Sequence, residues 1–321
     1  AGGHAGDGGQ GCAGGAQGLK DGCMAKAPAA PAARALNRAA LCRWPLPALD
    51  AEGDKNARGK VVIVAGSNEI PGAAVLAAEA ALRVGAGKLQ IATPASVAPM
   101  LAIAVPEARV IALSETRAGG LTPKAVEQLE AIAPRTDAVL FGPGMLSTRS
   151  TKGCIDAALP FFAGAITVLD AAALPSLHRV DGQRLVLTPH GGEMAQLLDM
   201  EREEVEQQAA SLCQRYAQEW GAALLLKGAT SWLGAPDGRL WKHKAPNAGL
   251  AMSGSGDVLA GLVAGLAARG ADAEQALAWG VVLHAGAGKC LGQAVGPVGY
   301  LARELSREFP ALLRELQQKG C

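Results

Sequence analysis

The chain has 321 residues and a formal net charge of +1, so it is long enough for one large α/β domain and lacks the basic excess of a nucleic-acid or membrane-surface binder. Aromatic residues make up only 3%, which argues against base-stacking platforms. The longest apolar run, at about 258–268, is too short to span a bilayer. We therefore expect neither a nucleic-acid partner nor a membrane partner. Seven cysteines without a CxxC pair predict reduced thiols in a cytoplasmic protein.

The first 40 residues differ in composition from the rest. Residues 1–23 contain ten glycines and almost nothing that could pack, and the first methionine is Met24. Such a segment cannot offset the entropy of ordering, so we expect 1–40 to be a disordered Gly/Ala/Pro-rich leader, with 1–23 outside the native protein. A single domain is expected over 41–321.

From residue 60 onward, strand and helix patterns alternate. The apolar run 61–65 predicts a buried parallel strand, Pro71 fits the first turn of a helix to about residue 84, and 88–92 predicts the next strand. Further strands are expected near 109–113, 138–141, 166–170, 185–188 and 222–226. Further helices are expected near 123–133, 152–159, 192–198, 203–220, 257–268, 273–291 and 299–318. This alternation predicts a three-layer αβα fold with a mostly parallel sheet and helices on both faces.

Polar and glycine-rich residues recur where the predicted strands end. Each could be an ordinary turn, but their recurrence on one edge favours a ligand site, because ligands of such folds bind outside the carboxyl ends of the strands. The segments are 66–68, 142–144, Asp170, 188–190 and 227–230.

The strongest local signal is a Gly/Ser loop that runs directly into an apolar helix. Gly254, Ser255 and Gly256 can turn backbone N–H groups toward one point, and a helix N-terminus adds positive potential, so we expect an anion cradle there. Asp257 in the first helical turn is either a capping residue or a base that takes a proton from a hydroxyl during phosphoryl transfer.

Four other residues allow either a structural or a functional interpretation. His190, at a strand end, is either structural or part of the site, and His284, in an apolar helix, is better explained as a satisfied core histidine. Asp170 either caps a helix or holds water, Mg²⁺ or a ligand hydroxyl. Lys227 either reaches a phosphate or extends out of the sheet toward solvent.

Taken together, these segments resemble the ADP-dependent NAD(P)H-hydrate dehydratase family, whose fold is ribokinase-like. The resemblance runs from about residue 41 to the C-terminus, and the motifs occur in the family's order. They are 58–67, 71–74, 83–87, 142–144, 169–171, 187–190, 193–194, 226–230 and 247–261. Two positions depart from the family's pattern: Ala172 stands where Asp or Gly often follows, and Gly191 stands where Pro is usual.

The resemblance implies a lyase that repairs damaged coenzyme. The S-form of hydrated NADH or NADPH would be dehydrated to NADH or NADPH, with ADP as phosphoryl donor and AMP and phosphate as products. Asp257 would be the catalytic base. The hydrate-binding residues would be Ala73, Ala74, Gly144, His190 and Asp257. The nucleotide-binding residues would be Lys227, Gly228, Ala229, Thr230, Ser231 and Gly256.

The resemblance also implies Mg²⁺ as cofactor, although the sequence does not identify its ligands. We expect a stand-alone enzyme, because the residues before the first strand are too few for the epimerase domain that the family often carries. A separate NAD(P)H-hydrate epimerase would then act in the same pathway, and the enzyme would be a homo-oligomer, a tetramer. Two alternatives remain open: a kinase of the same fold that phosphorylates a small alcohol, and a catalytically silent nucleotide-binding protein.

Overall fold

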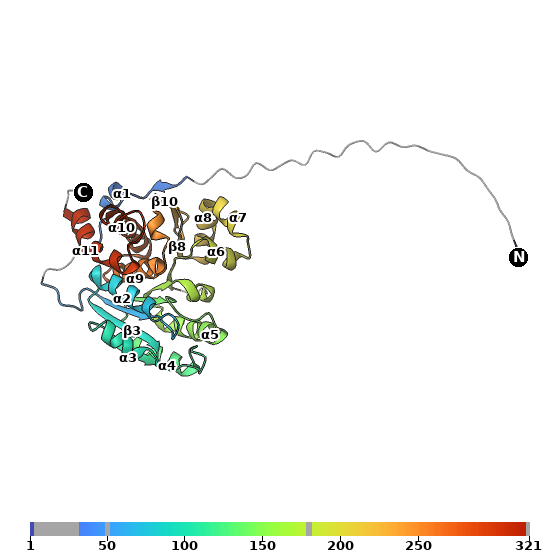
Figure 1. Ribbon diagram of the computed structural model, residues 1–321, viewed down its shortest axis with the longest axis horizontal. Helices are drawn as coiled ribbons and strands as arrows, with labels where there is room; N and C mark the ends of the chain where they lie inside the picture. Colours follow the sequence, from blue (N-terminus) through green and yellow to red (C-terminus); the bar gives the residue numbers. More distant parts are fainter. Residues whose placement is uncertain (3–31, 49–51, 178–181, 319–321) are drawn as a thin grey trace. The chain divides into compact units, whose positions relative to one another are not determined.

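The computed structural model describes residues 1–2, 32–48, 52–177 and 182–318. Contacts divide the chain into Ala1–Ala30 and Pro31–Cys321, and everything below concerns the second unit (Figure 1). Its strands are β1 (Arg34–Ala35), β2 (Lys60–Val64), β3 (Lys88–Pro94), β4 (Arg109–Leu113), β5 (Ala138–Phe141), β6 (Ile166–Leu169), β7 (Arg184–Leu187), β8 (Ala223–Leu226), β9 (Thr230–Gly234) and β10 (Leu240–Lys244).

The α-helices of the described residues alternate with these strands. They are α1 (Arg38–Cys42), α2 (Gly72–Arg83), α3 (Ala98–Ala104), α4 (Pro123–Ile132), α5 (Arg149–Ala158), α6 (Gly191–Leu198), α7 (Arg202–Gln207), α8 (Ala209–Trp220), α9 (Ser255–Ala268), α10 (Ala273–Ala294) and α11 (Ala302–Gln318). Short 3₁₀ turns η1 (Leu159–Phe162), η2 (Ala171–Ser176) and η3 (Ala248–Leu250) complete the set.

One sheet joins all ten strands in the order β1-β10-β9-β8-β7-β6-β5-β2-β3-β4. Pairing is parallel from β8 to β4, whereas β9 is antiparallel to both of its neighbours. One apolar core, which includes α2, α9, α10 and α11, covers one face, and a second core, which includes α4, α5 and α8, covers the other. The predicted three-layer αβα fold with a mostly parallel sheet is therefore confirmed.

Several elements differ from the prediction. Neither the β9–β10 hairpin nor helix α3 was expected, and the helix expected over 203–220 is divided at Gln208 into α7 and α8. The short strand β1 pairs with β10, and α1 begins at Arg38, so ordered structure begins inside the leader predicted over 1–40. The two residues of β1 carry no local strand pattern, and their pairing partner lies about 200 residues further on. Residues 3–31 of the leader lie outside the described part of the chain.

The cysteines agree only in part with the expectation of reduced thiols. Cys154, Cys213 and Cys290 are free, whereas Cys42 is disulfide-bonded. Sequence spacing does not reveal pairs that only folding brings together. Within the described ranges, none of the helices combines the length and apolar character needed to cross a membrane.

Helices α2 and α9 pack against each other unusually closely. A Cβ at Gly261 would overlap the backbone carbonyl of Ala77, and a Cβ at Gly265 would lie 2.7 Å from Ala81 Cα. Because both contacts advance by four residues along each helix, the helices run parallel. The same register places the start of α2 level with the start of α9, so Ala73 lies at the height of Asp257.

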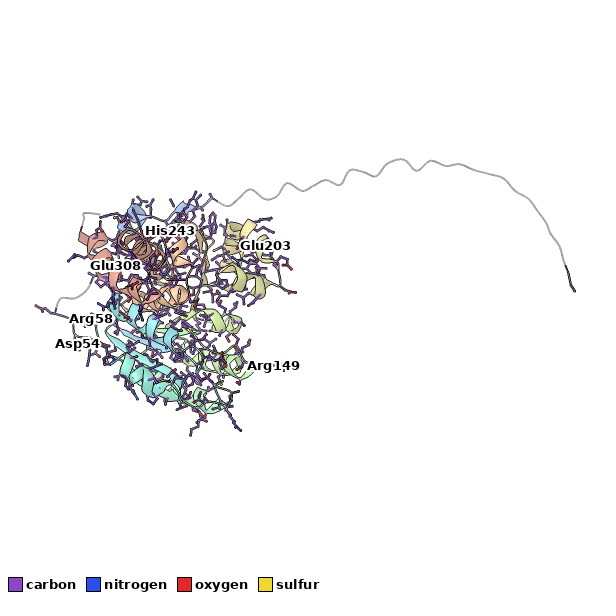
Figure 2. The ribbon with its side chains drawn as sticks, viewed as in Figure 1. Asp54, Arg58, Arg149, Glu203, His243 and Glu308 are labelled. Atoms are coloured by element: carbon purple, nitrogen blue, oxygen red, sulfur yellow. The ribbon has the colours of Figure 1, made fainter. Side chains whose placement is uncertain are left out.

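Charged side chains lie on the exterior of the domain. The exposed residues include Asp54 and Arg58 before β2, Arg149 at the start of α5 and Glu203 in α7 (Figure 2).

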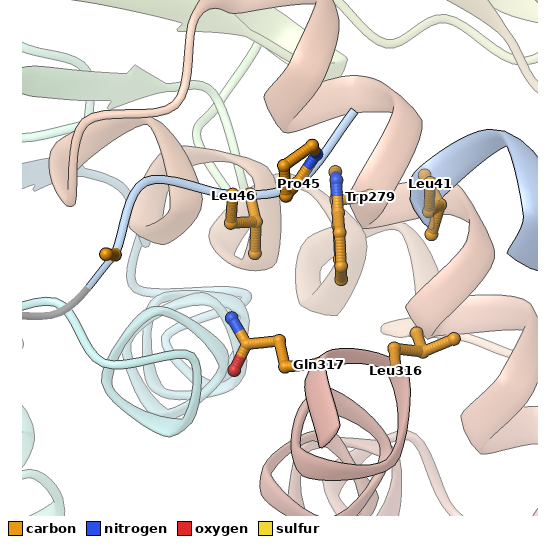
Figure 3. Close-up of a pocket in the computed structure, with 7 residues that line it drawn as sticks. Leu41, Pro45, Leu46, Trp279, Leu316 and Gln317 are labelled. Carbon is orange, nitrogen blue, oxygen red and sulfur yellow. The ribbon is translucent and has the colours of Figure 1, made fainter. Parts of the chain in front are cut away.

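A cavity of about 310 Å³ lies between the 41–48 segment, α10 and α11, where Trp279 lies among Leu41, Leu46 and Leu316 (Figure 3). Its lining carries no ionisable side chain, and it is separate from the carboxyl ends of the strands.

Candidate active site

Three neighbouring strand ends meet at one carboxylate. Asp170, which follows β6, is 2% exposed, and its Oδ1 accepts hydrogen bonds from Thr188 Oγ1 at 2.7 Å and Lys227 Nζ at 3.1 Å. Thr188 follows β7 and Lys227 follows β8, so the contacts tie consecutive strands of the sheet together. Asp170 makes no side-chain capping bond to η2, and Lys227 does not extend into solvent. Both residues therefore belong to the site.

Helix α6 begins beside this cluster. His190 is its N-cap, because Nδ1 accepts from the backbone N–H groups of Gly192 and Glu193, and Glu193 Oε2 in turn accepts from His190 N. A neutral ring whose Nδ1 is an acceptor carries its proton on Nε2. The Glu193 carboxylate also lies 3.8 Å from Lys227 Nζ. His190 thus caps α6 and remains exposed at the same edge, where it can also contact a ligand.

The predicted anion cradle forms the first turn of α9, which begins at Ser255 and not at residue 257. Gly254 adopts φ +87°, a left-handed conformation that favours glycine, and it caps the helix without a side-chain hydrogen bond. Ser255 N already donates to Met252 O, whereas no hydrogen bond among the described residues uses Gly256 N. The cradle therefore offers the Gly256 amide, the Ser255 hydroxyl and the positive end of α9.

Asp257 stands in this first turn with an unpaired carboxylate. Among the described residues, no hydrogen bond or ion pair reaches its side chain, so the capping interpretation is wrong. Burial and the neighbouring Asp170 raise the pKa of Asp257 to about 6, against the opposing effect of Lys227. Burial alone would lower the pKa of Lys227, but Asp170, Glu193 and Asp257 together raise it. A lysine that stays charged beside a carboxyl that titrates near 6 suits a general base.

A cavity of about 940 Å³ is lined by Lys227, Ser255 and Gly256 and lies between β8, β9, α10 and the 245–252 segment. Its walls include the apolar side chains of Leu250, Met252, Leu259 and Val281. Every predicted nucleotide-binding residue lines it: Lys227, Gly228, Ala229, Thr230, Ser231 and Gly256. Thr230 and Ser231 do so from the start of β9, a strand that the sequence analysis did not predict. Polar and ionisable side chains, among them Arg202, Glu206 and His243, also line the cavity. A cavity that combines apolar walls with polar groups is typical of a small-molecule site.

The predicted hydrate-binding residues are brought together only in part. Ala73 and Ala74 are 2% and 0% exposed, and they pack beneath two glycines. A Cβ at Gly144 would lie 2.7 Å from Ala73 Cβ, and a Cβ at Gly66 would lie 3.5 Å from Ala74 Cβ. The two alanines therefore shape the floor of the site, whereas Gly144 and His190 are accessible. Methyl groups are needed there because larger side chains would displace the glycine turns.

A protein-only metal cage is absent from the described residues, which contain no cluster of three or more His, Cys, Asp or Glu side chains that could hold an ion. Asp170 is already neutralised by Lys227. These residues fit a Mg²⁺ ion that is carried mainly by nucleotide phosphates and water, with one or two carboxylates at this edge.

Sequence reasoning placed Thr188 only within the polar segment 188–190, and it assigned no role at the site to Glu193 or His284. The first two act through contacts to Asp170, Lys227 and His190 that no spacing reveals. His284 is a buried histidine, as expected, but it lines the large cavity and contacts Ser255. The sequence did give a signal for His284, because it is the one histidine in the helix predicted over 273–291, which is rich in small and apolar residues.

Comparison with known proteins gives one consistent result. A family model described as NAD(P)H-hydrate dehydratase matches residues 61–311. An ADP-dependent (S)-NAD(P)H-hydrate dehydratase of Xanthomonas campestris is 48% identical over 287 residues, which cover 89% of this chain and 98% of that protein. A bifunctional NAD(P)H-hydrate repair enzyme of Moorella thermoacetica is 38% identical, and the match covers 89% of this chain and 55% of that enzyme.

Among solved structures, the ADP/ATP-dependent NAD(P)H-hydrate dehydratase from Bacillus subtilis, co-crystallised with ATP/Mg²⁺, superposes with a TM-score of 0.78 at 28% identity. That match covers 89% of this chain and 99% of the other. The family model spans most of the domain that carries Asp170, Lys227 and Asp257, and the Xanthomonas relative is matched over nearly its whole length. The chain therefore belongs to the NAD(P)H-hydrate dehydratase family.

Proposed function

We propose that this protein is an ADP-dependent dehydratase of the S-form of hydrated NADH and NADPH, a hydro-lyase that restores the usable coenzyme. The observation that carries the proposal is the unpaired Asp257 carboxylate in the first turn of α9, next to Gly256 and near Lys227, two residues that line a chamber suited to a nucleotide. The Xanthomonas relative carries this activity in its name.

The chemistry follows from the placement of these groups. The β-phosphate of ADP lies at the start of α9, where the Gly256 amide and the Ser255 hydroxyl stabilise charge that develops on the phosphoryl oxygens. Asp257 takes the proton from the hydrate hydroxyl as the hydroxyl oxygen attacks the β-phosphorus, and AMP leaves. The carbon–oxygen bond then breaks and phosphate leaves with its electron pair. A neighbouring carbon loses a proton to water, and the electrons of that C–H bond restore the ring double bond.

Lys227 has two functions in this scheme. Its charge stabilises the ionised form of Asp257, and it lies close to the cradle, since a Cβ at Gly256 would be 3.6 Å from Nζ. The adenosine part occupies the apolar chamber along Gly228, Ala229, Thr230 and Ser231. The hydrate lies over Gly144 and His190, with Ala73 and Ala74 as the floor. Mg²⁺, when bound with the nucleotide, neutralises phosphate charge.

Three further features belong to the proposal. A separate NAD(P)H-hydrate epimerase supplies the S-form, the enzyme assembles as a homotetramer, and it works in the cytoplasm. Light scattering coupled to size-exclusion chromatography measures the assembly directly, and a monomeric mass would contradict it.

The experiment that tests the activity is recovery of reduced-nicotinamide absorbance. Purified protein is mixed with hydrated NADH and Mg²⁺ plus either ADP or ATP, and a reaction without nucleotide is the control. Recovery with ADP supports the repair activity, and the ATP reaction gives the donor preference. If neither nucleotide gives recovery, although calorimetry shows that the protein binds ADP, the result would favour the small-alcohol kinase. The shared fold is the one observation that supports that alternative.

A further inference from the structure

His284 on α10 contacts Ser255 of the anion cradle. Its Nε2 lies 3.0 Å from the carbonyl oxygen of Ser255 and 3.1 Å from the Oγ of the same residue. The side chain is 8% exposed. A histidine in the middle of an apolar helix therefore holds both polar groups of one residue in the first turn of α9.

The chemistry of these two contacts fixes the positions of the hydrogens. A carbonyl oxygen only accepts, so His284 Nε2 must carry the proton and donate it. The Ser255 Oγ then faces an N–H group and accepts there, which leaves its own hydrogen free to point elsewhere. Burial lowers the pKa of His284 to about 4, and Lys227 acts in the same direction, so the ring is neutral near pH 7.

The same face of α10 builds the nucleotide chamber. Val281 and Ala285 line the cavity beside His284, since residues three and four apart share a helix face. One turn on, a Cβ at Gly288 would lie 2.7 Å from Leu250 and 2.8 Å from the Asn247 side chain, both of which also line the cavity. One helix face thus carries the wall of the chamber and the support of the cradle.

We propose that His284 is a positioning residue for phosphoryl transfer: its Nε2–H holds Ser255 so that the serine hydroxyl donates its hydrogen to an oxygen of the transferred phosphoryl group. The inference deepens the proposed function and rests on it for the identity of the phosphoryl donor. The acting group on the ligand is the terminal phosphate of a nucleoside diphosphate, so AMP, which lacks it, does not meet the serine hydroxyl.

Two substitutions at His284 separate positioning from packing. His284→Gln keeps an N–H near the position of Nε2, whereas His284→Leu removes the donor at similar bulk. Calorimetry with AMP and with ADP, both with Mg²⁺, is the first measurement. For His284→Leu we expect ADP affinity to fall about tenfold, as for a lost hydrogen bond to a charged group, with AMP affinity unchanged within about twofold. His284→Gln should bind both ligands within about threefold of the wild type.

The hydroxyl itself is tested by a double-mutant cycle. Ser255→Ala should lower ADP affinity as much as His284→Leu does, and the double variant should be no worse than either single variant, because both remove one interaction. Leu283→Ala is the matched control: Leu283 is the buried neighbour of His284 and does not line the cavity, so its substitution destabilises the core and leaves the ratio of ADP to AMP affinity unchanged.

Three results would overturn the proposal. They are equal losses of AMP and ADP affinity in His284→Leu, a His284→Gln variant as impaired as His284→Leu, and additive losses in the double variant. Because binding is read without the hydrate, a wild-type protein that fails to repair hydrated NADH would contradict the proposed function and leave this test intact. Where repair occurs, kcat/KM for ADP should follow the same order of variants.

Discussion

Lys227 Nζ lies 3.1 Å from Asp170 Oδ1, and this contact joins two strand ends that are 57 residues apart in the sequence. The carboxylate is almost fully buried, and the strand between them contributes Thr188 to the same oxygen. The lysine is therefore both the counter-ion of a buried acid and a group within reach of the cradle. We therefore expect both the stability of the fold and the binding of the nucleotide to depend on this one side chain.

Replacement of Lys227 by methionine should lower the free energy of unfolding by about 3 to 5 kcal/mol, because the buried Asp170 carboxyl group loses its counter-ion and retains only the hydrogen bond from Thr188. Denaturant unfolding measures this at pH 7. The double variant Lys227→Met/Asp170→Asn should recover most of the loss, since it removes the buried charge as well. A single variant as stable as the wild type would show that the pair does not neutralise the acid.

Asp257→Asn should abolish turnover and stabilise the protein at pH 7. The pKa of Asp257 is about 6 in the folded state and 3.8 by its ordinary value. Between these values the folded state binds more protons than the unfolded state, so stability falls as pH rises from about 4 to 6 and stays lower above. The ionised carboxylate thus costs up to about 3 kcal/mol at pH 7.

The measurement for this variant is thermal unfolding at pH 7 and pH 4.5. The gain in Tm at pH 7 should shrink at pH 4.5, where the wild-type carboxyl is protonated and uncharged. ADP binding by calorimetry provides the control, since only the base is removed. Turnover near the wild-type rate would refute the assignment of Asp257 as base.

The pH dependence of activity should also report the ionisation of Asp257. At saturating ADP and Mg²⁺, kcat/KM for the hydrate should fall as pH drops below about 6, because protonated Asp257 cannot accept a proton. Lys227 lowers the pKa of Asp257, so Lys227→Met should move this acidic limb to higher pH. Titration of the nucleotide phosphates is common to both proteins and cancels in the comparison. Identical limbs would mean that Lys227 does not act on the base.

Gly144→Ala should damage the hydrate site. Gly144 has φ +64°, and the added methyl would lie 2.7 Å from Ala73 Cβ, so the 142–144 turn must shift. We expect KM for the hydrate to rise, ADP affinity to stay unchanged, and stability to fall by about 1 to 3 kcal/mol. Gly153→Ala in α5 is the matched control, because nothing lies within 4 Å of its added methyl, and it should stabilise by about 0.5 to 1 kcal/mol. Equal kinetic behaviour of the two variants would contradict this role of Gly144.

Much of the fold was predictable because buried parallel strands are short apolar runs that end in glycine or polar residues, as in 61–65 and 138–141. The β9–β10 hairpin was overlooked because Thr230 and Ser231 look like loop residues, although Pro236-Asp237-Gly238 is a turn signal. The pairing of β1 with β10 has no local signal, since it depends on a contact across most of the chain.

At the site, the motif residues were predictable and their partners were not. Asp257 and the glycines before it form a local pattern, so spacing alone indicates an anion cradle. The contact of Lys227 with Glu193 depends on how α6 lies beside the end of β8, and the contact of His284 with Ser255 depends on how α10 packs against α9. The burial of Ala73 and Ala74 likewise depends on the glycine turns that cover them.

The glycine contacts of α9 with Ala77 and Ala81 of α2 have a kinetic consequence. Because backbone meets backbone along both helices, we expect the two helix starts to keep one separation whether or not either reactant is present. The proposed sites of the phosphoryl acceptor and the phosphoryl donor would then both exist before either reactant binds. We therefore expect the two substrates to bind in random order, with little synergy between them.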